Sequence, residues 1–124
     1  MGETLYDQVG GQEFFVRLVE LFYDAVELDE VLRPMYPEDL SESKHHLTLF
    51  LTQYWGGPRT YQAERGHPRL RLRHAPFRVT KRARDAWLAA MTSALDQLRV
   101  ELTSEQYDEL ISYFTMAATQ LRNV

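Results

Sequence analysis

A chain of 124 residues with 44% hydrophobic residues can close one hydrophobic core without disulfides. The absence of cysteine excludes a disulfide framework, a thiolate nucleophile and an iron–sulfur cluster. No run approaches the roughly 20 apolar residues of a membrane span, and no signal-peptide pattern is present, so we expect one cytoplasmic domain over residues 1–124. The net charge of −4 argues against a nucleic-acid partner, although the arginines between 65 and 78 form a local basic segment.

The N-terminal quarter predicts two helices. Thr4 can cap a short helix from Leu5 to Val9, which Gly10-Gly11 would end. A full helix should follow from Gln12 to about Leu28, because its apolar residues recur at helical spacing. The members of this stripe are Phe15, Leu18, Val19, Phe22 and Val26. Tyr23 should lie at the edge of the buried face, with its hydroxyl free to turn inward.

A compact corner and a second long helix come next. Pro34 and Pro37 bracket one helical turn, which should hold Tyr36 in place. Either Asp39 or Ser41 can cap the following helix. Its apolar set is Leu47, Phe50, Leu51 and Tyr54, and it should stop at Gly56-Gly57-Pro58.

The second half predicts a long functional loop and two more helices. Residues 59–79 lack periodicity and are rich in Gly, Pro and Arg, so we expect a loop with one short helix begun by Pro68. Thr80 should cap a helix that carries Trp87, and Thr103 with Gln106 forms a capping box for the last helix. No segment alternates with period two, so the predicted fold is all-α, with about four substantial helices.

The histidines are the first candidates for chemistry. Motifs of the common hydrolases, phosphate-binding loops and zinc proteases are absent, and the histidines at 45, 46, 67 and 74 lack the spacing of a structural zinc site. Adjacent residues on a helix point about 100° apart, so His45 and His46 suit the solvated surface. His67 is as well suited to capping a helix as to any other role. His74 lies between breakers, and it is either a buried histidine bonded to a backbone carbonyl or a single ligand.

Three aromatic residues bear on the choice for His74. Tyr23, Tyr36 and Trp87 each carry a hydrogen-bond donor and each belongs to a segment that otherwise supplies core. Singly, each fits an ordinary core position whose polar tip reaches the surface or a carbonyl. Together with one isolated histidine, they indicate a pocket that takes a polar ligand.

These residues lie in motifs that resemble the truncated haemoglobins, specifically their second group. The resemblance covers essentially the whole chain, and the stretch from Tyr54 to Phe77 is its most specific part. The matching motifs are Gly10-Gly11, Tyr23, Tyr36-Pro37-Glu38, Tyr54-Trp55-Gly56-Gly57-Pro58, Gly66-His67-Pro68-Arg69-Leu70-Arg71 and Arg73-His74-Ala75-Pro76-Phe77.

The resemblance implies a globin-like, truncated two-over-two helical sandwich that holds haem b (iron protoporphyrin IX). His74 would be the proximal iron ligand, its other ring nitrogen oriented by an acceptor that the sequence does not name. Tyr23, Tyr36 and Trp87 would contact the distal ligand. The remaining implied positions are Leu47 and Phe50 as cavity walls, Ser43 near the entrance, Phe77 against the haem, and Arg71, Arg73 and His67 toward the propionates. His46 stands where the family often has an arginine at the haem edge.

The implied function is reversible binding of dioxygen and other diatomic ligands. The bound oxygen would serve storage or delivery, or redox chemistry such as conversion of nitric oxide to nitrate or a peroxidase-like reaction. An unidentified reductase or other electron donor would then be a partner, and the protein would be a monomer or homodimer. The alternative from another class is a cofactor-free helical protein-interaction domain, in which His74 caps a turn and the aromatics fill the core.

Overall fold

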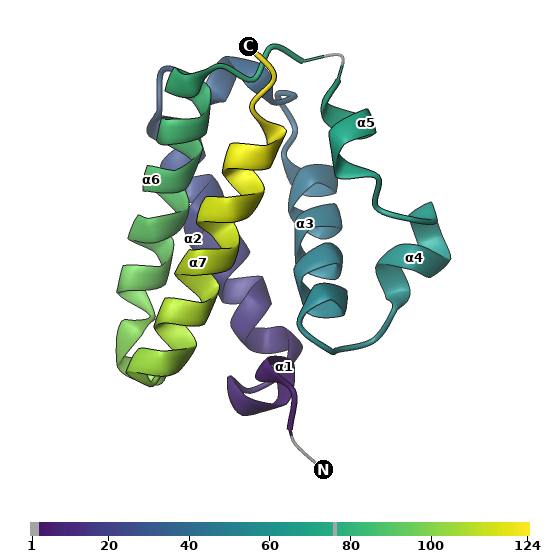
Figure 1. Ribbon diagram of the computed structural model, residues 1–124, viewed down its shortest axis with the longest axis vertical. Helices are drawn as coiled ribbons and strands as arrows, with labels where there is room; N and C mark the ends of the chain where they lie inside the picture. The colour runs from purple at the N-terminus through teal and green to yellow at the C-terminus, as the bar shows by residue number, and fades with distance from the viewer. Residues whose placement is uncertain (1–2, 76) are drawn as a thin grey trace.

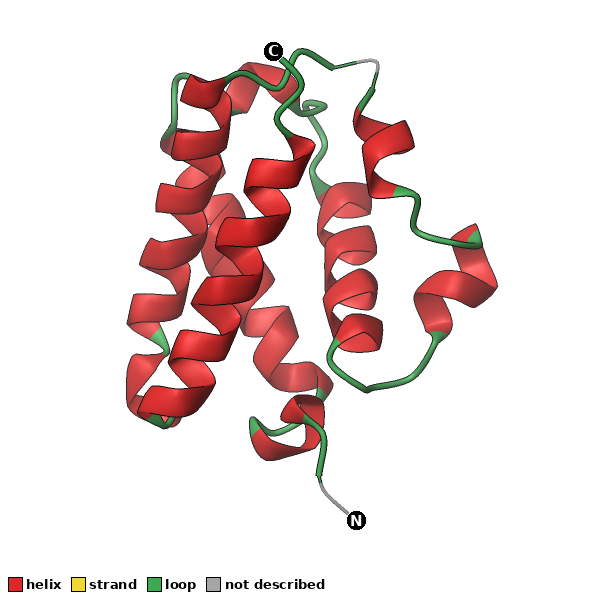
Figure 2. Cartoon of the chain, in the orientation of Figure 1, coloured by secondary structure: helices red, strands yellow, loops and turns green. Residues whose placement is uncertain are grey.

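The fold is a set of packed helices. The computed structural model describes residues 3–75 and 77–124, and every regular element within those ranges is helical (Figures 1 and 2). The elements are α1 (Leu5–Gln8), α2 (Gln12–Leu28), the 3-10 turn η1 (Arg33–Met35), α3 (Ser41–Tyr54), α4 (Thr60–Arg65), α5 (Leu70–His74), α6 (Lys81–Gln97), the 3-10 turn η2 (Arg99–Glu101) and α7 (Ser104–Leu121). None of the helices in the described part of the chain is both long and apolar enough to cross a membrane. The predicted all-α class is confirmed.

Two helix pairs form the body of the molecule. Helix α2 packs against both α3 and α6, and α6 packs against α7. Figure 1 shows α6 and α7 side by side in front of α2, with α3 beside them. The short helices α4 and α5 follow α3 on the outside, where α4 contacts α3 and α5 contacts α7. The two short helices therefore stand beside the pairs rather than inside the core.

Helix α2 supplies the centre of the core. All five residues of its predicted stripe are at most 1% exposed, and Phe14 is also fully buried. Burying a Phe, Leu or Val side chain stabilises a fold by about 1.5–3 kcal/mol, so this one helix contributes much of the driving force. Its partners across the core are Met91 and Leu95 of α6 and Leu110 and Phe114 of α7.

Local signals at the helix starts agree with the structure in three of four cases. Thr4 and Thr103 form capping boxes, and Thr80 accepts a hydrogen bond from the backbone N–H of Ala83 at 3.1 Å. The cap predicted for α3 is wrong in detail. The helix begins at Ser41 with Leu40 at the cap position, and the Asp39 carboxylate accepts from the Ser41 N–H at 2.9 Å.

The loop predicted over residues 59–79 is wrong in part, because it contains two short helices. Helix α4 was missed since Tyr61 is its one buried residue and a six-residue element shows no periodicity. Helix α5 begins at Leu70 rather than at Pro68, after Arg69 turns the chain with a left-handed φ of 44°. Pro76, predicted as the breaker after His74, lies outside the described residues.

The glycine pair after α3 permits a close crossing of chain segments. A Cβ built on Gly56 would lie 2.5 Å from the Cβ of Thr4, and one on Gly57 would lie 2.7 Å from the Tyr6 ring. The Tyr6 N–H also donates to the Trp55 carbonyl at 3.0 Å. The end of α3 is thereby fixed to the N-terminal segment, so the following stretch starts from a defined point.

We expect Gly56→Ala to destabilise the fold more than Gly10→Ala. Both glycines have nearly the same backbone angle, with φ of +102° and +104°, so both substitutions carry a left-handed strain of about 1–2 kcal/mol. Only Gly56 faces a close neighbour, since nothing lies within 4 Å of a Cβ at Gly10. The clash should add about 1–3 kcal/mol, which urea unfolding of the two variants would measure. Equal losses would show that the crossing is not tight.

Candidate functional site

His74 is the last residue of α5, and one of its ring nitrogens is already occupied. Its Nδ1 lies 2.7 Å from the carbonyl oxygen of Leu70, one helical turn earlier, and the side chain is half-buried. An acceptor at that distance requires the hydrogen on Nδ1, so Nε2 keeps a free lone pair. The ring therefore satisfies a backbone carbonyl and presents a metal-binding nitrogen at the same time. The four-residue spacing could have identified the Leu70 acceptor from the sequence.

The chain after His74 is fastened by a residue that the sequence did not indicate. Asn123 donates from its side-chain nitrogen to the Phe77 carbonyl at 2.9 Å, and its side-chain oxygen accepts from the Val79 N–H at 2.9 Å. The Asn123 N–H also donates to the Val79 carbonyl at 2.9 Å. The segment beyond α7 thus holds the backbone that follows α5, over 40 residues away in sequence.

The predicted donor aromatics share one buried cluster with neighbouring rings. Tyr23 packs edge-on against Tyr36, with ring centroids 5.5 Å apart and planes at 88°. Phe22, next to Tyr23 on α2, lies 5.3 Å from Trp87, and Trp87 lies 5.9 Å from Phe114. The donors thus come from α2, the corner after η1 and α6, three separate parts of the chain. Phe22 was predicted only as a core residue, yet it and Phe114 pack against Trp87 and set its position.

Burial keeps the two phenols of this cluster protonated. Loss of solvation raises the pKa of Tyr23, with the neighbouring Tyr36 adding to the rise and a polar contact from Ser43 opposing it. Loss of solvation also raises the pKa of Tyr36, to about 12, against an opposing polar contact from Trp87. Both hydroxyls are therefore hydrogen-bond donors throughout the physiological pH range.

Helix α3 carries the positions that were predicted as cavity walls and entrance. Leu47 and Phe50 are half-buried and pack against the core, and Ser43 reaches Tyr23. Phe50 is backed by Tyr61 of α4, with ring centroids 5.6 Å apart. Tyr61 is 3% exposed and was not predicted, because it lies within the stretch expected to be a loop.

The basic side chains expected near a cofactor have different surroundings. Arg73 donates to the backbone carbonyls of Pro68 at 2.7 Å and Arg65 at 3.0 Å, so its guanidinium supports the turn before α5. His67 accepts from the Arg69 N–H at 3.2 Å, so it stabilises the left-handed residue before α5, although α5 itself has no side-chain cap. Arg71 is exposed on α5.

Two further positions lie at the margin of the site. Burial lowers the pKa of His46, and the nearby Arg65 lowers it further. A largely neutral imidazole binds a carboxylate less strongly than the arginine common at this position would. Phe77 is 50% exposed close to His74 in the chain, which is apolar surface of the kind that a porphyrin can cover.

These features fit a haem. A single histidine with a free Nε2 suits an iron whose four equatorial ligands come from a porphyrin, and the two desolvated phenols with the half-buried indole suit a small polar ligand on the iron. Arg71 remains available for a propionate. Packed helix pairs with one such histidine and a polar aromatic cluster define a haem-binding protein of globin type.

Comparison with known proteins gives the particular family. Residues 4–123 match the family model of the bacterial-like globins. Group 2 truncated hemoglobin YjbI of Bacillus subtilis is 45% identical over 104 residues, covering 82% of this chain and 78% of the relative. The thermostable hemoglobin of Thermobifida fusca is 50% identical with a TM-score of 0.95 and 98% coverage of both chains. The truncated oxygen-avid haemoglobin of Bacillus subtilis is 39% identical, with a TM-score of 0.90 over 98% of this chain and 100% of that one. The chain belongs to the truncated haemoglobins.

Family membership decides several expectations from the sequence. The truncated two-over-two globin fold is confirmed, as are haem b as the cofactor and the binding of diatomic ligands. The alternative, a cofactor-free helical interaction domain, has no support. The roles of individual residues stay predictions.

The pKa of Tyr36 leads to a prediction for alkaline pH. Its folded value is about 12, above the ordinary value of about 10 for an unfolded chain. The neutral phenol therefore favours the folded state, and this contribution should be lost as the pH rises from about 10 to 12. In protein labelled with carbon-13 at the tyrosine Cζ, the Tyr36 resonance should remain that of a phenol at pH 11. Tyr36→Phe assigns the signal, and ionisation near pH 10 would contradict the buried donor.

Proposed function

We propose that residues 1–124 form one haem-binding domain that holds dioxygen tightly and uses it for redox chemistry in the cytoplasm. The observation that supports this most is the pairing of two features. His74 presents a free Nε2, fixed by the 2.7 Å contact of its Nδ1 with Leu70, and the buried cluster of Tyr23, Tyr36 and Trp87 supplies donors for a ligand. Haem supplies the iron at which the diatomic ligand binds.

The donor cluster explains why release should be slow. Dioxygen at a haem carries partial negative charge on its outer oxygen, and a donor in a dry pocket stabilises that charge more than water does. The phenols cannot ionise in the working pH range and the indole donates only. Tyr36 and Trp87 are therefore the donors, with Tyr23 holding Tyr36 in place through their edge-on contact.

Slow release favours chemistry on the bound oxygen over delivery. The reaction we infer is conversion of nitric oxide to nitrate by the bound dioxygen, with a peroxidase-like reaction as the second candidate and storage as the non-enzymatic one. Each nitric oxide cycle leaves ferric haem, so a reductase or other electron donor must restore the ferrous form. The protein would act as a monomer or a homodimer.

The haem would be held by residues around α5 and α3. His74 would hold the iron through Nε2, Phe77, Leu47 and Phe50 would provide apolar contacts, and Ser43 would lie at the entrance. Arg71 is the main propionate partner in this proposal, because its guanidinium has no ion pair in the described part of the chain. Arg73, His67 and His46 are secondary, since Arg73 and His67 already bond backbone groups and His46 is largely neutral.

Removing His74 tests the axial bond. After reconstitution with haemin, the wild type should show a Soret band and a ferrous dioxygen complex, whereas His74→Ala should lose most of its haem on gel filtration. His45→Ala is a suitable control because His45 pairs with Glu64 on the exposed surface at 3.0 Å. A wild type without a Soret band would overturn the proposal.

The donors are tested by oxygen dissociation measured in stopped flow. Tyr36→Phe and Trp87→Phe should each speed release about tenfold, because a hydrogen bond of about 1.5 kcal/mol to the ligand is lost. Tyr107→Phe serves as a control, since that hydroxyl bonds Asp96 on the exposed side of the molecule. Unchanged release in both pocket variants would contradict the donor assignment.

Mixing the wild-type dioxygen complex with nitric oxide should yield nitrate faster than dioxygen leaves; a slower reaction would favour storage.

A further inference from the structure

The charges of this chain are segregated to a degree that the haem does not explain. Nine of its fourteen basic residues lie between 59 and 84, where Glu64 is the one acidic residue. This segment therefore carries a formal charge of +8, and the rest of the chain carries −12. Two propionates can neutralise two cations at most. Asp85, directly after the segment, pairs with Lys81 and Arg84. The other arginines of the segment form no ion pair with a described residue, so they give the part of the molecule that carries His74 a positive field.

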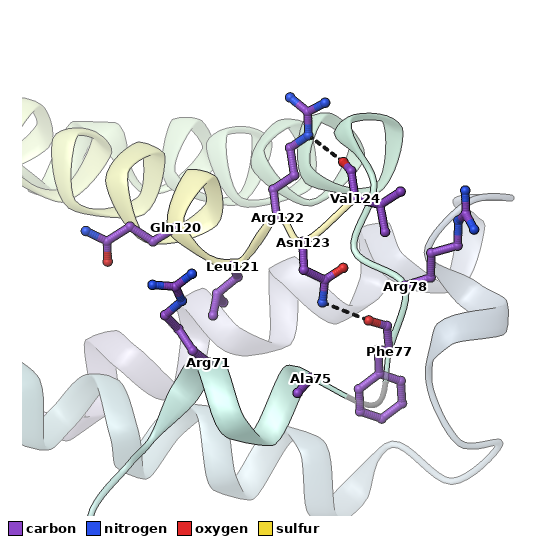
Figure 3. A pocket seen from close by; sticks show the side chains of 9 residues that line it. All are labelled: Arg71, Ala75, Phe77, Arg78, Gln120, Leu121, Arg122, Asn123 and Val124. Atoms are coloured by element: carbon purple, nitrogen blue, oxygen red, sulfur yellow. Dashed lines mark hydrogen bonds between the residues drawn. The ribbon is translucent and has the colours of Figure 1, made fainter.

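Part of this positive charge lines a pocket behind α5. An open pocket of about 550 Å³ lies between α5 and the end of α7 (Figure 3). Arg71, Arg78 and Arg122 line it, together with Ala75, Phe77 and residues 120–121 and 123–124, so no Asp or Glu side chain is among its described lining residues. All three arginines are exposed, and neither Arg71 nor Arg78 forms an ion pair with a described residue.

The three guanidinium groups do not converge on one point. Figure 3 shows them apart from one another around the rim, with Arg122 bonded through its Nε to the Val124 oxygen at 3.0 Å. A compact anion such as phosphate is best held by donors that meet at one place. Separated cations around a hollow suit several carboxylates spread over the surface of another protein.

The pocket wall is also bonded to the backbone beside the proposed iron ligand. Asn123 lines the pocket and donates to the Phe77 carbonyl at 2.9 Å, and its side-chain nitrogen lies 3.5 Å from the His74 carbonyl oxygen. Asn123 therefore connects the pocket wall to the backbone of the segment that carries His74.

We propose that the pocket rim with Arg78 and Arg122 is the docking surface for an acidic one-electron carrier protein of the iron–sulfur or flavin type, while Arg71 on the same rim is kept for a haem propionate. This inference rests on the proposed function, in which ferric haem must be reduced again. The carrier gives up one electron and is itself oxidised by one, and the electron converts ferric iron to ferrous with no atom transferred. Contacts of this kind are small and governed by charge, so they should form quickly and weaken with salt.

The test measures reduction of the ferric protein by a reduced, acidic plant-type ferredoxin in stopped flow. At low ionic strength, about 10 mM, Arg78→Glu/Arg122→Glu should be reduced about tenfold or more slowly than the wild type, because the steering field is reversed. The reduction rates of the variant and the wild type should become nearly equal at about 0.5 M salt, because salt screens the charges. Arg71 is left unchanged in this variant because of its proposed propionate contact.

A matched variant separates the docking surface from net charge. Arg59→Glu/Arg99→Glu changes the charge by the same amount at exposed positions outside the pocket, and it should stay within about twofold of the wild type. Equal slowing in both variants would overturn the proposed surface, as would no slowing in either. Calorimetric titration with oxidised ferredoxin should show the same order of affinities without any turnover.

Two further binding measurements distinguish an acidic protein from other anionic partners. Binding of inorganic phosphate at micromolar concentration that Arg78→Glu/Arg122→Glu abolishes would make the pocket a small-anion site and overturn the proposal. Binding of a DNA duplex at physiological salt tighter than that of ferredoxin would do the same. The Soret band and the oxygen release rate report on the proposed function separately. If they are intact while reduction rates are equal, this inference alone fails.

Discussion

The hydrogen bond from His74 to the Leu70 carbonyl is the contact on which the site depends, because it leaves Nε2 as the ring nitrogen with a free lone pair. Helix α5 is a single turn, with the acceptor as its first residue and the histidine as its last. A change of one residue in its length would rotate the ring by about 100°. The surrounding contacts preserve this register: His67 and Arg73 fasten the left-handed entry at Arg69, and Asn123 fastens the exit.

The cluster of donor aromatics depends on α2, which is itself the centre of the core. Phe22 and Tyr23 are neighbours on that helix, so they point about 100° apart. One packs against Trp87 and the other against Tyr36, and each contact positions a donor. Since α2 is fully packed, the donors are held by the same burial that stabilises the fold. The burial that raises the pKa of the phenols therefore also excludes the water that would compete with a ligand.

Periodic patterns predicted the long helices well, since a stripe over four turns leaves many concordant positions in α2 and α7. The family motif around His74 identified the fold and the cofactor. Helix α4 was not predicted, because one buried aromatic residue, Tyr61, cannot define a helical period. The hydrogen bonds of Arg73 and Asn123 were not predicted for a different reason. Their partners are individual backbone groups whose positions the fold sets, and a polar side chain carries no local sign of which backbone group it reaches.

The basic segment shows how one stretch of sequence can serve several tasks. Like charges close together repel, so a formal charge of +8 over 26 residues destabilises the compact fold. Interactions that these charges make can offset that cost. Arg73 is used within the chain, on two carbonyls, and Arg71 points outward from the helix that carries His74. Under the proposed docking, Arg78 would be used on a partner protein at the pocket between α5 and the end of α7. The acidic remainder of the molecule repels an acidic carrier elsewhere, so the segregation also orients the encounter.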